Sequence, residues 1–133
     1  MPATHHIDNE SRLIHTTWEG EATDSEFITA LKKYLDEIQS DPEFIYYNEI
    51  VNLTEATPIN LGIRGLLAIG RIAAQAEKRI PGKKMALIID SDFAIGLANM
   101  YIFYRNMGDE SRKKIAVFKK EGEAYKWVKT ISN

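Results

Sequence analysis

Cysteine is absent from the 133-residue chain. A chain without thiols forms no disulfides, has no thiol nucleophile and offers no cysteine ligands to zinc, which suits a reducing cytoplasm. The N-terminus also lacks the positively charged start and apolar run of a signal peptide, and no run approaches the roughly 18 apolar residues of a membrane span. We therefore expect a mature cytoplasmic protein with no membrane span.

An excess of charge of one sign is lacking as well, because 17 Lys and Arg residues stand against 19 Asp and Glu residues, for a formal net charge of -2. This balance gives no general attraction to nucleic acid, and no nucleic-acid partner is predicted. Internal repeats, low-complexity tracts and long Gly/Ser linkers are missing too. The length is that of one domain, so a single domain over 1–133 is expected.

Hydrophobic periodicity predicts nine elements in the order β-β-α-β-α-β-α-β-α. Strands are expected near 4–8, 12–19, 44–53, 85–89 and 115–118, and helices from a capping box at 23–26 to 38, then near 60–79, 91–107 and 122–129. Thr23 and Glu26 have the spacing at which both side chains satisfy backbone donors, and Gly108 is expected to cap the third helix. The pattern predicts an α/β fold with a mostly parallel sheet, an N-terminal antiparallel hairpin and flanking helices.

The stretch Val51–Leu66 is the most informative part of the chain. Its apolar start is typical of a buried strand, and its end has the pattern of a helix. Between them, Pro58 is expected to break the strand and turn the chain into the helix.

Three places in the chain resemble one family. Residues 6–8 and 14–20 look like its first hairpin, 52–60 looks like its Asp-Leu-Ser-x-Val-x-x-Ile-Asp junction, and 118–128 looks like its closing strand and helix. In these places the chain resembles the SpoIIAA-like family, also described as STAS/SEC14 domains and related to anti-sigma-factor antagonists. The resemblance implies a small sheet flanked by helices and a role in protein recognition.

In anti-sigma-factor antagonists, that recognition is switched by phosphorylation of a serine near the start of the helix after the junction. This chain has Leu61, Gly62 and Ile63 there, none with a hydroxyl group, so the switch is not carried over. Thr54 and Thr57 match structural positions of the junction, where a threonine closes a turn more often than it accepts phosphate.

Two stretches raise the possibility of an enzyme. Residues 65–72 have the glycine spacing of a P-loop but lack its lysine and its Ser or Thr, so close helix packing explains the glycines better. Asp90, Ser91 and Asp92 follow the fourth strand, where two carboxylates could hold a hard cation or act as acid and base, with Thr54 near the same crevice. The alternative is that they cap the next helix.

All three histidines fall in the opening hairpin. If its turn centres on Glu10, His5 and His15 face each other across the strands. A third or fourth ligand at fixed spacing is missing from the sequence, so exposed strand histidines are favoured over a zinc site and no metal site is predicted.

A binding role has more support than catalysis, and the support comes from the predicted second and third helices. Arg64, Arg71 and Lys78 recur every seven residues on one face, where they could meet an anionic lipid surface, a phosphate-bearing ligand or an acidic protein, or lie solvated. On the third helix, apolar and aromatic residues encircle more than one core-facing stripe requires: Phe93, Leu97, Met100, Tyr101, Phe103, Tyr104 and Met107. This helix is predicted to cover a small apolar pocket or to pair with its copy in a homodimer.

These patterns favour a non-catalytic binding or regulatory module that recognises a protein partner or a small apolar or anionic ligand. A small enzyme using Asp90 and Asp92 is the alternative, although no catalytic residue and no cofactor is assigned. Peripheral membrane contact and homodimerisation are left open. The candidate binding residues are Thr54, Asn60, Arg64, Arg71, Asp90, Ser91, Asp92, Met100, Tyr101 and Tyr104.

Overall fold

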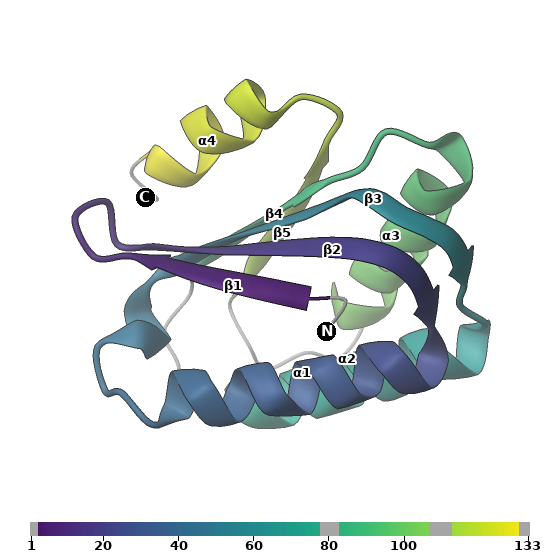
Figure 1. The fold of residues 1–133 in the computed structure, drawn as a ribbon, viewed down its shortest axis with the longest axis horizontal. Helices are drawn as coiled ribbons and strands as arrows, with labels where there is room; N and C mark the ends of the chain where they lie inside the picture. The colour runs from purple at the N-terminus through teal and green to yellow at the C-terminus, as the bar shows by residue number, and fades with distance from the viewer. Residues whose placement is uncertain (1–2, 78–82, 107–112, 131–133) are drawn as a thin grey trace.

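The computed structural model describes residues 3–77, 83–106 and 113–130 (Figure 1). Its strands are β1 Ala3–Asp8, β2 Leu13–Thr23, β3 Asn48–Asn60, β4 Lys84–Ile88 and β5 Lys114–Phe118, and its helices are α1 Asp24–Gln39, α2 Ile63–Glu77, α3 Asp92–Asn106 and α4 Glu121–Lys129. A short 3-10 helix, η1 Phe44–Tyr46, precedes β3. Apart from η1, the order is the predicted one.

The five strands form one sheet in the order β1-β2-β3-β4-β5, antiparallel between β1 and β2 and parallel elsewhere. The predicted α/β fold is thereby confirmed. Each crossover moves one strand further in the same direction, and right-handed crossovers of this kind place their helices on one face. Figure 1 shows α1 and α2 on one side of the sheet and α4 on the other.

Side chains of β4 alternate between two cores, one on each face of the sheet. Ala86 and Ile88 pack with Ala124 of α4, whereas Leu87 packs with Ala98 of α3. A strand that is apolar on both faces is expected where helices cover both sides, and this explains why 85–89 has no polar face. We call the side covered by α1, α2 and α3 the inner face.

The predicted capping box starts α1. The backbone N–H of Glu26 donates to Thr23 Oγ1 at 3.3 Å, and the Thr23 hydroxyl donates to Glu26 Oε1 at 3.0 Å. The carboxylate therefore holds the capping hydroxyl itself, instead of the backbone N–H of Thr23 as predicted.

The predicted break of the third strand at Pro58 is wrong. β3 begins at Asn48, after η1, and continues to Asn60, so α2 starts only at Ile63. Beyond Asn52, β3 pairs with β2 alone, so Pro58 lies on an edge segment, where a missing backbone N–H is tolerated. The pairing with β2 shifts register on both sides of Gly20, which has a φ of 92°.

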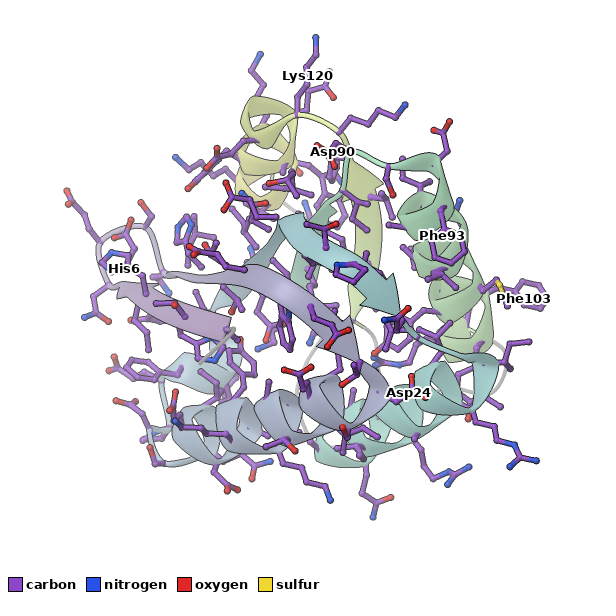
Figure 2. All side chains as sticks on the ribbon, turned by 45° about the vertical axis from the view of Figure 1, so that its right-hand side comes forward. His6, Asp24, Asp90, Phe93, Phe103 and Lys120 are labelled. Atoms are coloured by element: carbon purple, nitrogen blue, oxygen red, sulfur yellow. The ribbon has the colours of Figure 1, made fainter. Side chains whose placement is uncertain are left out.

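The glycines of α2 allow close packing, as the sequence predicted. A Cβ atom on Gly65 would overlap the Asp24 carboxylate, and one on Gly70 would lie 2.8 Å from the Tyr104 ring. Asp24 Oδ1 also accepts the backbone N–H of Gly62 at 3.1 Å, so this side chain of α1 caps the start of α2 (Figure 2). α2 is thus fitted between α1 and α3.

The hairpin register differs from the prediction by one residue. His6, and not His5, lies opposite His15, because the turn covers four residues and centres between Glu10 and Ser11. His5 lies opposite Thr16. The predicted cap at Gly108 and two predicted surface residues, Lys78 and Met107, lie outside the described residues.

Candidate functional site

A cavity of about 200 Å³ lies between the inner face of the sheet and helices α1, α2 and α3. Most of its wall is apolar, and it comes from strands and helices alike. The principal apolar residues are Trp18, Phe27, Leu31, Leu35, Val51, Leu53, Ile59, Leu66, Ile69, Ala73, Met85, Leu87, Ile89, Ala94, Leu97 and Ala98.

The side chains of α1 that line the cavity are less buried than the core side chains of α4. On α4, Ala124 and Val128 are 0% and 2% exposed. The cavity-lining side chains of α1, such as Phe27 and Leu31, are only half-buried although they point toward the sheet. The amphipathic stripe of α1 thus borders an open space.

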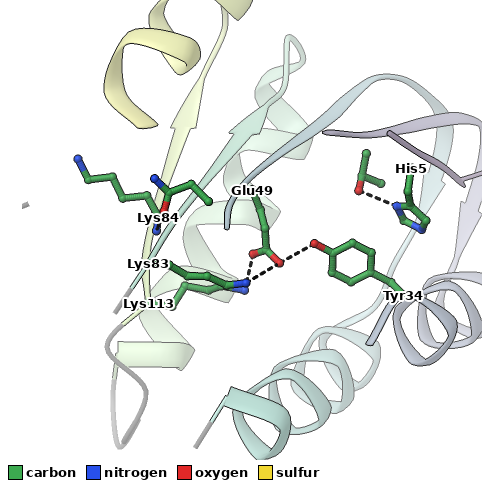
Figure 3. A network of polar contacts seen from close by, with 8 residues as sticks. His5, Tyr34, Glu49, Lys83, Lys84 and Lys113 are labelled. Atoms are coloured by element: carbon green, nitrogen blue, oxygen red, sulfur yellow. Dashed lines mark hydrogen bonds and ion pairs between the residues drawn. The ribbon is translucent and has the colours of Figure 1, made fainter. Parts of the chain in front are cut away.

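A buried ionic cluster lies where β3, β4 and β5 begin (Figure 3). Glu49 on β3 is 3% exposed, and its carboxylate is 3.4 Å from Lys83 Nζ and 2.6 Å from Lys113 Nζ. Tyr34 of α1 donates its hydroxyl to Glu49 Oε1 at 2.6 Å. The two lysines immediately precede β4 and β5, and the backbone N–H of Lys114 donates to the Lys83 carbonyl at 2.8 Å.

These neighbours keep Glu49 ionised. Burial alone raises the pKa of a carboxyl group, but the charges of Lys113 and Lys83 and the hydrogen bond from Tyr34 outweigh it and lower the pKa of Glu49 to about 2. Tyr34, Glu49 and Lys113 all border the cavity. The cavity wall therefore contains fixed charges at neutral pH.

Two further polar pairs lie in the same wall. Arg105, at the end of α3, is 3% exposed and donates from Nη1 to Tyr101 Oη at 3.0 Å. His5 shares a hydrogen bond of 2.8 Å with Thr16 Oγ1, and its ring centroid is 4.7 Å from that of Tyr34. Burial lowers the pKa of His5, which favours the neutral imidazole at pH 7.

Lys84, next to Lys83, turns to the other face of the sheet. Its ammonium donates to the carbonyl oxygens of Trp127 at 3.1 Å and Thr130 at 2.8 Å, and to the Thr130 hydroxyl. Lysine near the last carbonyl groups of a helix stabilises its C-terminus. Lys84 thus holds α4, whereas Lys83 belongs to the buried cluster.

Of the predicted binding residues, Tyr101 lines the cavity. The predicted residues that follow β4 lie at the surface. Ser91 Oγ accepts the backbone N–H of Ala94 at 3.0 Å, and the Asp92 side chain is 97% exposed. Asp90 is exposed as well. The geometry of Ser91 and Asp92 is that of a helix cap and first turn.

The remaining predicted residues lie outside the cavity wall. Thr54 donates its hydroxyl to Asn52 Oδ1 at 2.7 Å, within the strand, and Asn60 Nδ2 donates to Glu21 Oε2 at 3.2 Å. Arg64 and Arg71 are exposed on α2. A contact of these side chains with a partner stays a prediction.

Three large apolar side chains of α3 are exposed. Phe93, Met100 and Phe103 are 64%, 46% and 69% exposed, and Figure 2 shows Phe103 pointing away from the body of the molecule. Tyr104 packs beside Gly70 instead. Pairing of α3 with its copy stays a prediction.

Sequence reasoning missed the ionic cluster because it looked for a site at the carboxyl ends of the strands. A signal was present: Lys83-Lys84 and Lys113-Lys114 both precede a short apolar strand. Neighbouring parallel strands in register bring such pairs together, and Lys84 lies opposite Lys114 in the sheet. Lys83 and Lys113, the first lysine of each pair, precede β4 and β5, and both reach Glu49 on β3.

A comparison of the sequence with protein-family models and with curated proteins finds no match. Among solved structures, the chain is similar to an uncharacterized protein of the DUF3478 family from Shewanella loihica PV-4, described as having a SpoIIAA-like fold. The TM-score is 0.61 and the identity 10%, over 95% of this chain and 91% of the other. The chain has a SpoIIAA-like fold. The resemblance noted in the sequence is confirmed at the level of the fold.

In the part of the chain that the structure describes, no helix is both long enough and apolar enough to cross a bilayer.

Proposed function

We propose that this SpoIIAA-like domain works by binding a small, largely apolar molecule in the cavity between its sheet and helices α1, α2 and α3, without chemistry of its own. The observation that carries the proposal is the cavity itself, about 200 Å³ with mostly apolar walls. An apolar protein cavity of roughly 150 Å³ is large enough to bind benzene. A ligand somewhat larger than benzene therefore fits.

Energetics favour an occupant. Side chains that line a cavity lack neighbouring atoms on one side and so lose van der Waals contacts. Water needs two to four polar partners and is poorly held by walls such as Leu53, Ile69 and Leu97. An apolar ligand can recover contacts that water cannot make.

The phosphorylation switch of anti-sigma-factor antagonists has no part in the proposed function. The segment joining β3 to α2 is Leu61-Gly62, followed by Ile63 at the first position of the helix. None of these side chains can accept a phosphoryl group. Regulation would have to act through the ligand or through another surface.

Thermal unfolding with a series of neutral alcohols from 1-butanol to 1-decanol tests the proposal. We expect a saturable rise of the Tm with 1-hexanol or 1-octanol, because a ligand selective for the folded state stabilises it by about 2.7 kcal/mol at 100 times its Kd. The Trp18 side chain lies in the cavity wall, so its fluorescence should change over the same concentrations.

Two neighbouring alanines of α2 provide a matched pair of variants. Ala73 lines the cavity and Ala74 does not, so Ala73→Leu should fill part of the space and weaken alcohol binding at least tenfold, while Ala74→Leu should leave it unchanged. Absence of a saturable shift for the whole alcohol series in the parent would contradict the proposal. Equal effects of the two substitutions would place binding elsewhere.

A further inference from the structure

The charged side chains of the cavity wall, together with Tyr34, lie toward one end. Glu49 lies at the start of β3, Lys113 directly precedes β5, and Tyr34 reaches Glu49 from the second half of α1. Arg105 is the penultimate residue of α3, a helix that runs back from the end of β4 toward the start of β5. All four line the cavity at the amino ends of the parallel strands.

The opposite end is apolar. Leu53 and Ile59 on β3, Ile89 after β4 and Ala94 on the first turn of α3 line the part nearer the carboxyl ends of the strands. Along the strand direction, the wall of the cavity therefore changes from charged to apolar. A purely apolar ligand would use only the apolar part.

We propose that the ligand is an amphipathic monocarboxylic acid with a tail of about six to eight carbons, its tail among the apolar residues and its carboxylate beside Lys113, Arg105 and Tyr34. This inference rests on the proposed function, since it assigns a chemical class to the occupant of the same cavity. The carboxylate is bound as an additional acceptor within a network that is already formed.

The charges of the wall favour an acid. Lys113 and Arg105 are donor-only side chains, and guanidinium groups bind carboxylates through paired hydrogen bonds. Among the described residues of the wall, Glu49 is the one carboxylate, and Lys83 and Lys113 both approach it closely. A ligand amine would have Glu49 as its anionic partner but would lie beside these cations.

The cavity volume limits the tail. A cavity of roughly 150 Å³ binds benzene, with its six carbon atoms, so about 200 Å³ has room for about eight groups of that size. Hexanoate and octanoate are close to this limit, whereas the chain of a long membrane lipid exceeds it.

The test is calorimetric titration of the full chain with octanoate, 1-octanol and octylamine at pH 7. We expect octanoate to bind at least tenfold more tightly than 1-octanol, and octylamine more weakly than either, because a hydrogen bond to a charged group changes affinity by about tenfold or more. This comparison needs no substitution, so it decides the proposal even where a variant fails to fold.

Consecutive lysines give the matched variants. Lys113 lines the cavity, whereas Lys114 is exposed. Lys113→Met should weaken octanoate about tenfold and leave 1-octanol within about twofold, while Lys114→Met should change neither. Arg105→Met, paired with the exposed Arg71→Met, repeats the test on another element.

The outcomes separate the two proposals. Equal affinities for octanoate and 1-octanol, or equal losses of both in Lys113→Met, would overturn the assignment of an acid while leaving apolar binding in place. Failure of all three probes to bind would overturn both. A preference for octylamine would assign the charged end to a cation held by Glu49 and so contradict the inference.

Discussion

At the scale of single residues, Glu49 shows how a strongly perturbed group arises from ordinary parts. A carboxylate at 3% exposure is stabilised because two lysines and one tyrosine hydroxyl are directed at it from three separate elements. Removing one partner of such a cluster leaves a buried charge that water cannot reach, which usually costs more than the pair contributes.

The pKa of Glu49 predicts a specific pH dependence. The folded-state pKa of about 2 lies below the ordinary 4.5, so ionised Glu49 contributes stability above about pH 4.5 and loses it as the pH falls toward 2. Glu49→Gln should lower the free energy of unfolding by about 3 kcal/mol at pH 7, at 1.36 kcal/mol per pKa unit. The gap from the parent should shrink below about pH 4.5, as measured by urea unfolding from pH 7 to 3.

The exposed Glu55 on the same strand provides the control, since Glu55→Gln should change the stability by less than about 0.5 kcal/mol throughout. A gap between Glu49→Gln and the parent that stays constant down to pH 3 would show that the carboxylate is not held ionised in the folded state.

At the scale of elements, α2 depends on glycines at its contacts with α1 and α3. Gly70 allows the Tyr104 ring to lie against the helix backbone, while Gly96 of α3 has open space where a side chain would be. The same residue type therefore has opposite consequences in two neighbouring helices.

Alanine substitution at these two glycines tests that difference. Gly70→Ala should destabilise the protein by about 1–3 kcal/mol through overpacking against Tyr104. Gly96→Ala should stabilise it by about 0.5–1 kcal/mol, because alanine loses less backbone entropy in a helix. Chemical denaturation measures both, and equal effects of the same sign would show that the α2–α3 contact is not close.

Local signals predicted most elements, and long-range pairing explains the failures. The start of α1 follows from Thr23 and Glu26, which lie within one helical turn. The prediction that Pro58 breaks the strand is wrong because β2 continues to Thr23 and pairs with β3 on both sides of Pro58. The sequence close to Pro58 does not show that β4 stops pairing with β3 at Asn52.

The same limit applies to the candidate site. The aromatic pattern of its helix predicts Tyr101 as a binding residue, and Tyr101 lines the cavity. Lys83 and Lys113 are 30 positions apart in the chain and both approach Glu49. Their meeting depends on the register of three strands, which hydrophobic periodicity does not specify.

At the scale of the whole molecule, the two faces of the sheet differ because the cavity lies on the inner face. The α4 face is filled, with Ile88 at 2% exposure beneath Ala124 and Val128. The inner face borders the cavity, and Ile89 is part of its wall. The loss of a methyl group should therefore cost more stability on the α4 face than on the inner face.

Adjacent isoleucines with the same exposure compare the faces directly. Ile88→Val should cost about 1 kcal/mol, because a methyl group is removed from a filled core. Ile89→Val should cost less, because it extends an existing space, and it alone should change the affinity for 1-octanol. Denaturant unfolding and titration measure the two effects, and a larger loss of stability in Ile89→Val would contradict the assignment of the faces.

The cavity on the inner face also affects how strongly hydrostatic pressure destabilises the protein. Unfolding eliminates internal voids and so reduces the total volume of protein and solvent, by about 20–100 mL/mol in proteins generally and more where voids are larger. For a domain of 133 residues with a cavity of about 200 Å³, we expect a volume change of unfolding toward the large end of that range. Hydrostatic pressure should therefore unfold the ligand-free protein readily. A ligand bound in the cavity should raise the pressure at which half of the protein is unfolded.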